Sequence, residues 1–95
     1  MTIYKLVFKE EAKKEWECLD TAVRSIFAKK LKERMLQPQI ESARLSGTKG
    51  CYKIKLNRAG FRLVYQVRNK ELIVSVIAVG KRERNAVYKT ASKRI

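Results

Sequence analysis

Three basic residues near the middle of the chain have a spacing that could bind a phosphate. Lys53 and Lys55 alternate with apolar residues, and Arg62 lies in a second alternating run shortly afterwards. Alternation predicts two strands, and the Asn- and Gly-containing segment between them predicts a tight turn. The resulting register places Lys55 directly opposite Arg62 and Lys53 beside Val64. On the other face it pairs Leu56 with Phe61, Ile54 with Leu63 and Tyr52 with Tyr65.

Like charges directly across a pair of strands destabilise a sheet by a few tenths of a kcal/mol up to ~1 kcal/mol. Folding alone therefore gives no reason to place Lys55 opposite Arg62, whereas a phosphate between them would reverse the sign of the interaction. We expect the sheet face that carries them to be turned away from the helices and to form a concave phosphate-binding surface. The alternative interpretation is that these long side chains only solvate an exposed sheet face.

A second group of candidates follows the last predicted strand. Gly80 permits a sharp exit or the close approach of a ligand, and the cations Lys81, Arg82 and Arg84 follow it, where they can reach the same face. Tyr88 comes four residues after Arg84 and shares its side of a predicted final helix. The tyrosine ring could stack on a nucleobase, or it could pack against the edge of the sheet.

The residue types that are missing limit the chemistry. The chain has no histidine, which excludes histidine metal sites, Ser–His triads and RNA cleavage by a histidine pair. Cys18 and Cys51 have no metal-ligand spacing, and they favour free thiols in a reducing compartment over a disulfide. We therefore expect no metal and no cofactor, and a reaction carried out by Lys, Arg, Tyr, Glu or Asp.

The charge balance predicts a polyanionic partner. Lys and Arg number 23 against 9 Asp and Glu, which gives a net charge of +14 on 95 residues. Such an excess indicates nucleic acid, the ribosome or an acidic protein, the alternative being a basic protein without such a partner. The sequence shows no apolar run that could span a membrane and no secretory signal pattern, so we expect a cytoplasmic protein with no membrane partner.

The elements that position these residues form a single predicted α+β domain over residues 1–95. The periodicities predict, in order, a strand at 2–8, a helix at 9–18, a helix capped by Asp20 or Thr21 and ended by Pro38, a loop at 39–50, strands at 51–57, 61–68 and 72–79, and a basic helix at 84–95. This β-α-α-β-β-β-α order predicts an N-terminal strand and a helical hairpin packed on a mostly antiparallel four-stranded sheet. The short C-terminal helix has only a thin apolar line, which predicts weak docking.

Several runs together resemble the RelE toxins of the RelE/ParE superfamily. They are CYKIKL at 51–56, GFRLVYQV at 60–67, VGKRER at 79–84 and VY at 87–88, with KEW at 14–16 and KRI at 93–95. The resemblance covers nearly the whole chain. It implies a small RelE-like fold and a metal-independent endoribonuclease, the toxin of a type II toxin–antitoxin system. It also implies a catalytic set of Lys53, Lys55, Arg62, Arg82 and Tyr88. We expect further RNA contacts at Arg44, Lys81 and Arg84.

The resemblance implies a mechanism as well. Messenger RNA is held in the ribosomal A site and is cut after the second nucleotide of the codon by its own 2′-hydroxyl, which leaves a 2′,3′-cyclic phosphate and stops translation. Lys55 would take or orient the hydroxyl proton, Arg62 and Lys53 would hold the scissile phosphate, and Tyr88 would stack on the base before the cut. Arg82 is the family's leaving-group acid, but arginine scarcely deprotonates, so we favour charge stabilisation.

The implied partners are the message, the 16S and 23S ribosomal RNA, and an acidic RelB-like antitoxin. An amphipathic helix of the antitoxin would displace the C-terminal helix and move Tyr88 out of the site. Operator DNA would be bound only through the antitoxin. Two other functions remain open: a ParE-like toxin that inhibits DNA gyrase without cutting RNA, and a basic RNA- or ribosome-binding module without catalysis.

Overall fold

A computed structural model describes residues 4–45, 50–56, 60–81 and 86–94. Its elements are β1 (Lys5–Phe8), α1 (Glu10–Glu17), α2 (Thr21–Leu36), the short 3-10 helix η1 (Glu41–Ala43), β2 (Cys51–Leu56), β3 (Phe61–Arg68), β4 (Ile73–Lys81) and α3 (Ala86–Arg94). The predicted order of strands and helices is confirmed, and η1 is an addition to the predicted loop. The turn residues 57–59 and the ends of the predicted first strand and last helix lie outside the described residues.

The four strands form one sheet in the order β1-β4-β3-β2. β2 pairs with β3 and β3 with β4 in the antiparallel sense, while β1 runs parallel to β4. β4 therefore has a neighbouring strand on each side. Its sequence is apolar on both faces because each face is buried in a different core cluster, Val74, Val76 and Val79 in one and Ile77 and Ala78 in the other. β2 is an edge strand, contacted on its outer side by the isolated bridge between Arg44 and Tyr52.

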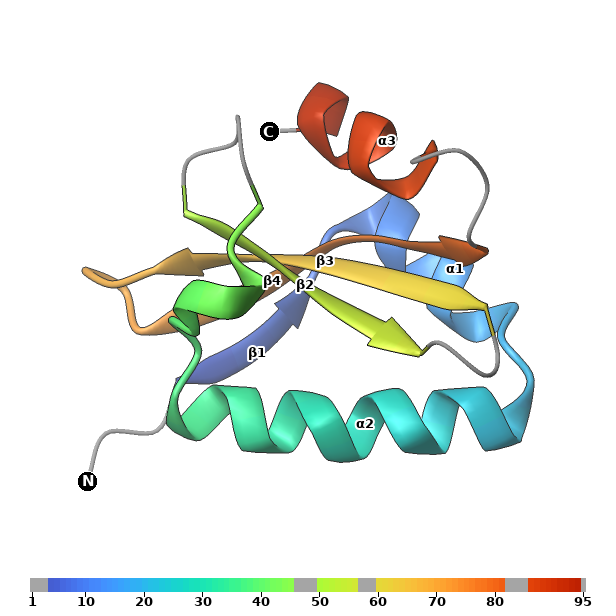
Figure 1. Cartoon of the computed structure of the whole chain (residues 1–95), viewed down its shortest axis with the longest axis horizontal. Coiled ribbons are helices and arrows are strands. Elements are labelled where there is room, and N and C mark those ends of the chain that lie inside the picture. The colour runs from blue at the N-terminus through green and yellow to red at the C-terminus, as the bar shows by residue number, and fades with distance from the viewer. Residues whose placement is uncertain (1–3, 46–49, 57–59, 82–85, 95) are drawn as a thin grey trace.

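The sheet lies between two unequal helical layers (Figure 1). The helical hairpin of α1 and α2 covers one face and forms the larger core cluster, which includes Ala12, Phe27, Leu63 and Tyr65. The short helix α3 lies across the other face and forms a smaller cluster: Leu45, Cys51, Val64, Ile77, Ala78, Val87 and Ala91, with Tyr88 packed against it. The face opposite the hairpin is thus partly covered, and only part of it is open.

The ends of α2 follow from local sequence. Pro38 cannot continue a helix, and α2 ends at Leu36. Asp20 occupies the N-cap position as predicted, but its side chain makes no capping hydrogen bond. The predicted loop after Pro38 is also more ordered than expected, because it contains η1 and the bridge from Arg44 to β2.

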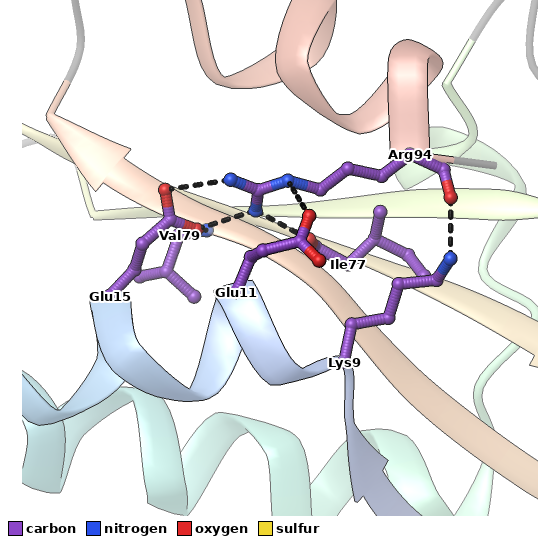
Figure 2. A network of polar contacts seen from close by, with 6 residues as sticks. All are labelled: Lys9, Glu11, Glu15, Ile77, Val79 and Arg94. Atoms are coloured by element: carbon purple, nitrogen blue, oxygen red, sulfur yellow. Dashed lines mark hydrogen bonds and ion pairs between the residues drawn. The ribbon is translucent and has the colours of Figure 1, made fainter.

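Helix α3 is held by more than its thin apolar line. Val87 and Ala91 are buried, and Arg94 lies three residues after Ala91 on the same side of the helix. Arg94 Nη1 donates to Glu15 Oε1 at 2.7 Å and to the carbonyl of Ile77 at 2.9 Å (Figure 2). These contacts join α3 to α1 and β4. The apolar residues alone therefore underestimate how strongly α3 is attached to the rest of the domain.

A carboxylate at the centre of this network raises the pKa of Arg94. Glu15 is the main cause, through its hydrogen bonds, while Glu11 adds a second ion pair at 3.2 Å. The Glu15 carboxylate also accepts a hydrogen bond from the backbone N–H of Val79 at 3.2 Å. Lys9 donates from its ammonium group to the carbonyl of Arg94 and so ties the end of α3 to the start of α1.

Both cysteines are free, as the sequence favoured. Cys18 is exposed, whereas Cys51 is fully buried in the smaller cluster. Burial raises the pKa of the Cys51 thiol to about 11, so the thiol stays protonated near neutral pH and acts as a small core residue.

Within the described ranges, none of the helices has the length and apolarity needed to cross a membrane.

Candidate nucleic-acid interface

The β2–β3 hairpin gathers three of the predicted site residues on one face. Its register pairs Lys55 with Arg62, Lys53 with Val64, and Tyr52 with Tyr65, as the sequence predicted. Tyr65 belongs to the core cluster under α1 and α2, and Val64 belongs to the cluster under α3. The alternation of side chains therefore places Lys53, Lys55 and Arg62 on the α3 side of the sheet. Lys55 is exposed, while Lys53 and Arg62 are half-buried.

Helix α3 begins directly beside this group of cations. Arg62 pairs with Gly80 of β4, and a Cβ placed on Gly80 would lie 3.2 Å from Cγ2 of Val87. The sequence left open a sharp exit or a close ligand approach at Gly80, and the structure shows the close approach of a helix instead. The open part of the face is therefore the part over β2 and the start of β3, where Lys55 and Arg62 lie.

Tyr88 lies on the same face and packs against the surface of the sheet, whereas the packing alternative placed it at the sheet edge. Its ring packs against the smaller cluster, and the Lys53 ammonium nitrogen lies 5.8 Å from the ring centroid. Its hydroxyl oxygen is buried and has no hydrogen-bond partner among the described residues. The ring as a whole is only half-buried in this position.

The unpartnered hydroxyl gives a direct prediction for folding. Burying a hydroxyl without a partner is unfavourable, so Tyr88→Phe should raise the free energy of unfolding by about 1 kcal/mol. Urea denaturation measures the difference. Tyr88→Ala is the matched control, because it removes the ring and should lower the free energy of unfolding by about 3 kcal/mol. A Phe variant less stable than the parent would show that the hydroxyl has a partner after all.

The remaining predicted residues do not all join this group. β4 runs two residues further than predicted and ends at Lys81. Lys81 pairs with Phe61, whose side chain packs on the side of the sheet that α1 and α2 cover. Lys81 therefore belongs to the opposite side from Lys55 and Arg62, which corrects the expectation that it reaches their face. Arg82 and Arg84 lie outside the described residues.

Arg44 also lies away from the cations of the β2–β3 hairpin. Its bridge to Tyr52 puts it on the side of the sheet that α1 and α2 cover, while its neighbour Leu45 packs under α3. Arg44 is exposed and pairs with Glu41 at 3.6 Å. A surface ion pair of this kind contributes little to stability.

One cation that the sequence analysis did not connect to the site approaches it from α2. A groove of about 250 Å³ at the outer edge of β2 is lined by Arg34, Ser42, Ala43, Lys53 and Lys55. Arg34 follows Leu31 by three residues and so occupies the side of α2 that faces the core. A charged residue at such a position is the sequence signal that could have identified it.

Arg34 is held in place by a buried tyrosine. Its Nη1 donates to the Tyr65 hydroxyl at 2.9 Å, and that hydroxyl donates to the carbonyl of Pro38 at 2.7 Å. Burial raises the pKa of the Tyr65 hydroxyl above its ordinary value, with a smaller opposing effect from Arg34, so the hydroxyl keeps its proton. The guanidinium of Arg34 is thus held in position in the lining of the groove.

The chemistry available on this surface is that of fixed positive charge. Two ammonium groups and two guanidinium groups surround the open part of the face, and amines and guanidiniums of this kind bind phosphate oxygens. The same charges stabilise a phosphorane, whose negative charge grows during transfer at phosphorus. Among the described residues, no three His, Cys, Asp or Glu side chains gather in a way that could hold a metal ion.

Comparison with known proteins identifies the family. The family described as ParE toxin of type II toxin-antitoxin system, parDE, matches residues 6–86. A putative RelE-like toxin protein of Escherichia coli is 56% identical over 92 residues, and the mRNA interferase toxin RelE of E. coli K12 is 52% identical over 92 residues, each match covering 97% of both chains. The chain belongs to the RelE/ParE toxin family. It is a toxin of this family, and RelE proteins are among its curated relatives.

Solved structures agree with this placement. A free-state arginine-to-alanine double mutant of E. coli toxin RelE matches with a TM-score of 0.91 at 49% identity, over 98% of each chain. The RelE chain of the intact E. coli RelBE toxin–antitoxin complex matches with a TM-score of 0.82 at 51% identity, over 85% of this toxin and 99% of that chain. The RelE-like α+β fold expected from the sequence is therefore confirmed.

Proposed function

We propose that this toxin is a metal-independent mRNA interferase that cuts messages held in the ribosomal A site. The single observation that supports it most is the placement of Lys55 directly opposite Arg62, with Lys53 beside them, on the part of the sheet face that α3 leaves open. Folding disfavours this arrangement, whereas an RNA phosphate between the cations would stabilise it. The relatives named mRNA interferase RelE supply the reaction class.

Each residue of the proposed catalytic set has a role that its chemistry allows. The 2′-hydroxyl oxygen of the RNA attacks the adjacent phosphorus, the bond from phosphorus to the 5′-oxygen breaks, and the 2′-proton must be removed while the 5′-oxygen gains one. Lys55 removes or orients the 2′-proton, and Arg62 and Lys53 hold the scissile phosphate. Arg82 stabilises charge on the leaving oxygen. Tyr88 stacks on the base before the cut.

The partners follow from the same proposal. The message and the 16S and 23S ribosomal RNA are the polyanions that the net charge of +14 would bind, with Arg44, Lys81 and Arg84 as additional phosphate contacts. An acidic RelB-like antitoxin neutralises the toxin in the cytoplasm, and operator DNA is bound only through that antitoxin. Because both core clusters share β3 and β4, we treat residues 1–95 as one toxin domain.

The test separates this function from the two alternatives. Ribosomes programmed with a defined message are incubated with the toxin, and the 5′ ends of the fragments are mapped by primer extension; DNA gyrase supercoiling is measured with the same preparation. We expect cuts inside the A-site codon, no inhibition of gyrase, and loss of cutting by Arg82→Ala with ribosome binding retained. Gyrase inhibition without cuts would establish the ParE-like alternative, and ribosome binding without cuts would establish a non-catalytic binding module.

A further inference from the structure

The groove at the outer edge of β2 contains more positive charge than folding explains. Its lining includes the three cations Arg34, Lys53 and Lys55 but no carboxylate. Arg44, Arg68 and Arg94 each pair with a glutamate, whereas Arg34 pairs with none among the described residues. Three like charges around a small hollow repel one another, so an anion in the groove would relieve that repulsion.

Arg34 is suited to that anion because its position is fixed in advance. One of its five N–H donors is used by the Tyr65 hydroxyl at 2.9 Å, and its guanidinium carbon lies 5.9 Å from the centroid of the Tyr65 ring. Tyr65 is fully buried and stacks on Tyr52 with their centroids 5.7 Å apart. A guanidinium that is already oriented loses little conformational entropy when it binds a ligand, and its planar fork matches two phosphate oxygens.

The position of the groove indicates which phosphate it receives. Lys53 and Lys55 line it and also belong to the cation group on the α3 side of the sheet, so the groove continues the proposed cleavage site around the edge of β2. A single strand of RNA that crosses that face can therefore place a neighbouring phosphate in the groove. We propose that Arg34 is a substrate-positioning residue that binds a phosphate of the message next to the scissile one, an inference that rests on the proposed function.

The experiment measures toxin affinity for two kinds of ribosome. In one the A site is vacant because the message ends at the P-site codon, and in the other it holds a codon made uncleavable by 2′-deoxy substitution. Arg34→Gln should weaken binding to the codon-filled ribosome by about tenfold to a hundredfold, the loss expected for one charged hydrogen-bonded contact. It should leave binding to the vacant ribosome unchanged. Arg68→Gln, which removes the same charge from a surface ion pair with Glu71, should change neither.

Two further measurements keep the outcome interpretable. Arg34→Lys keeps the charge but loses the fork, so it should recover only part of the affinity, and urea denaturation of each variant verifies that it is folded. An Arg34→Gln variant that binds both ribosomes as Arg68→Gln does would overturn the inference. An equal loss on both ribosomes would also overturn it, because the phosphate would then belong to ribosomal RNA. The proposed function itself would fail differently: the unaltered toxin would not cut an RNA codon.

Discussion

Arg62→Gln should slow single-turnover cutting on programmed ribosomes by about a hundredfold to a thousandfold, the loss typical when one group that stabilises charge in a transition state is removed. The same variant should not be less stable than the parent. Arg62 faces Lys55 across the strand pair, and within the described part of the chain its side chain donates a hydrogen bond only from Nη1 to the carbonyl of Phe61, at 3.0 Å. Removing one of two facing charges should raise the free energy of unfolding by a few tenths of a kcal/mol up to ~1 kcal/mol.

The opposite directions of these two effects make the prediction informative. Substituting a residue that the fold requires lowers both activity and stability. Substituting a residue that serves only the substrate lowers activity without lowering stability. Arg68→Gln controls for the removal of one positive charge from β3, since Arg68 lies in the same strand and pairs with Glu71 at 3.8 Å on the surface. A clear fall in the unfolding free energy of Arg62→Gln would assign Arg62 a structural role instead.

Arg94→Met should lower the free energy of unfolding by about 2–3 kcal/mol, because it removes the side chain that joins α3 to α1 and β4. The Glu15 carboxylate would keep its hydrogen bond from the N–H of Val79 but lose both bonds from the guanidinium. The carbonyl of Ile77 would also lose its donor. Hydrogen exchange should show the largest loss of protection in α3, whose apolar contacts are few.

The matched control for this prediction lies in the same network. Glu11 is 61% exposed at its side chain, so water screens its ion pair with Arg94 and Glu11→Gln should change the unfolding free energy by less than about 0.5 kcal/mol. If Arg94→Met were as mild as Glu11→Gln, the network in Figure 2 would contribute little and α3 would depend on Val87 and Ala91 alone. High salt should weaken the parent more than Arg94→Met, because salt screens the ion pairs that only the parent has.

The parts of the structure that local sequence determines were predictable. The β2–β3 register follows from a short turn and from side-chain alternation, and a slip of one residue would turn Ile54 and Leu63 to the wrong face. The end of α2 follows from Pro38. These features depend on residues close together in the chain, and they placed Lys53, Lys55 and Arg62 correctly relative to one another.

The features that the sequence analysis missed depend on contacts between distant segments. Arg94 binds Glu15, a residue 79 positions earlier in the chain, and Arg34 binds Tyr65, 31 positions later. Lys81 was expected in a loop that reaches the face of Lys55 and Arg62. Instead β4 continues past Gly80, and the pairing of Lys81 with Phe61 turns its side chain to the opposite face of the sheet. The periodicity of apolar residues shows which face of a helix or strand is buried. It does not show which other element packs against that face.

The most direct test of the whole account is a message with one 2′-deoxy nucleotide at the second position of the A-site codon, compared with an all-RNA message on identical ribosomes. We predict that the toxin binds both, cuts only the all-RNA message, and leaves a 2′,3′-cyclic phosphate and a 5′-hydroxyl. If the deoxy message were cut at that same position, or if the all-RNA product carried a 5′-phosphate, the cations opposite the helical hairpin would not catalyse attack by the 2′-hydroxyl and the account would be wrong.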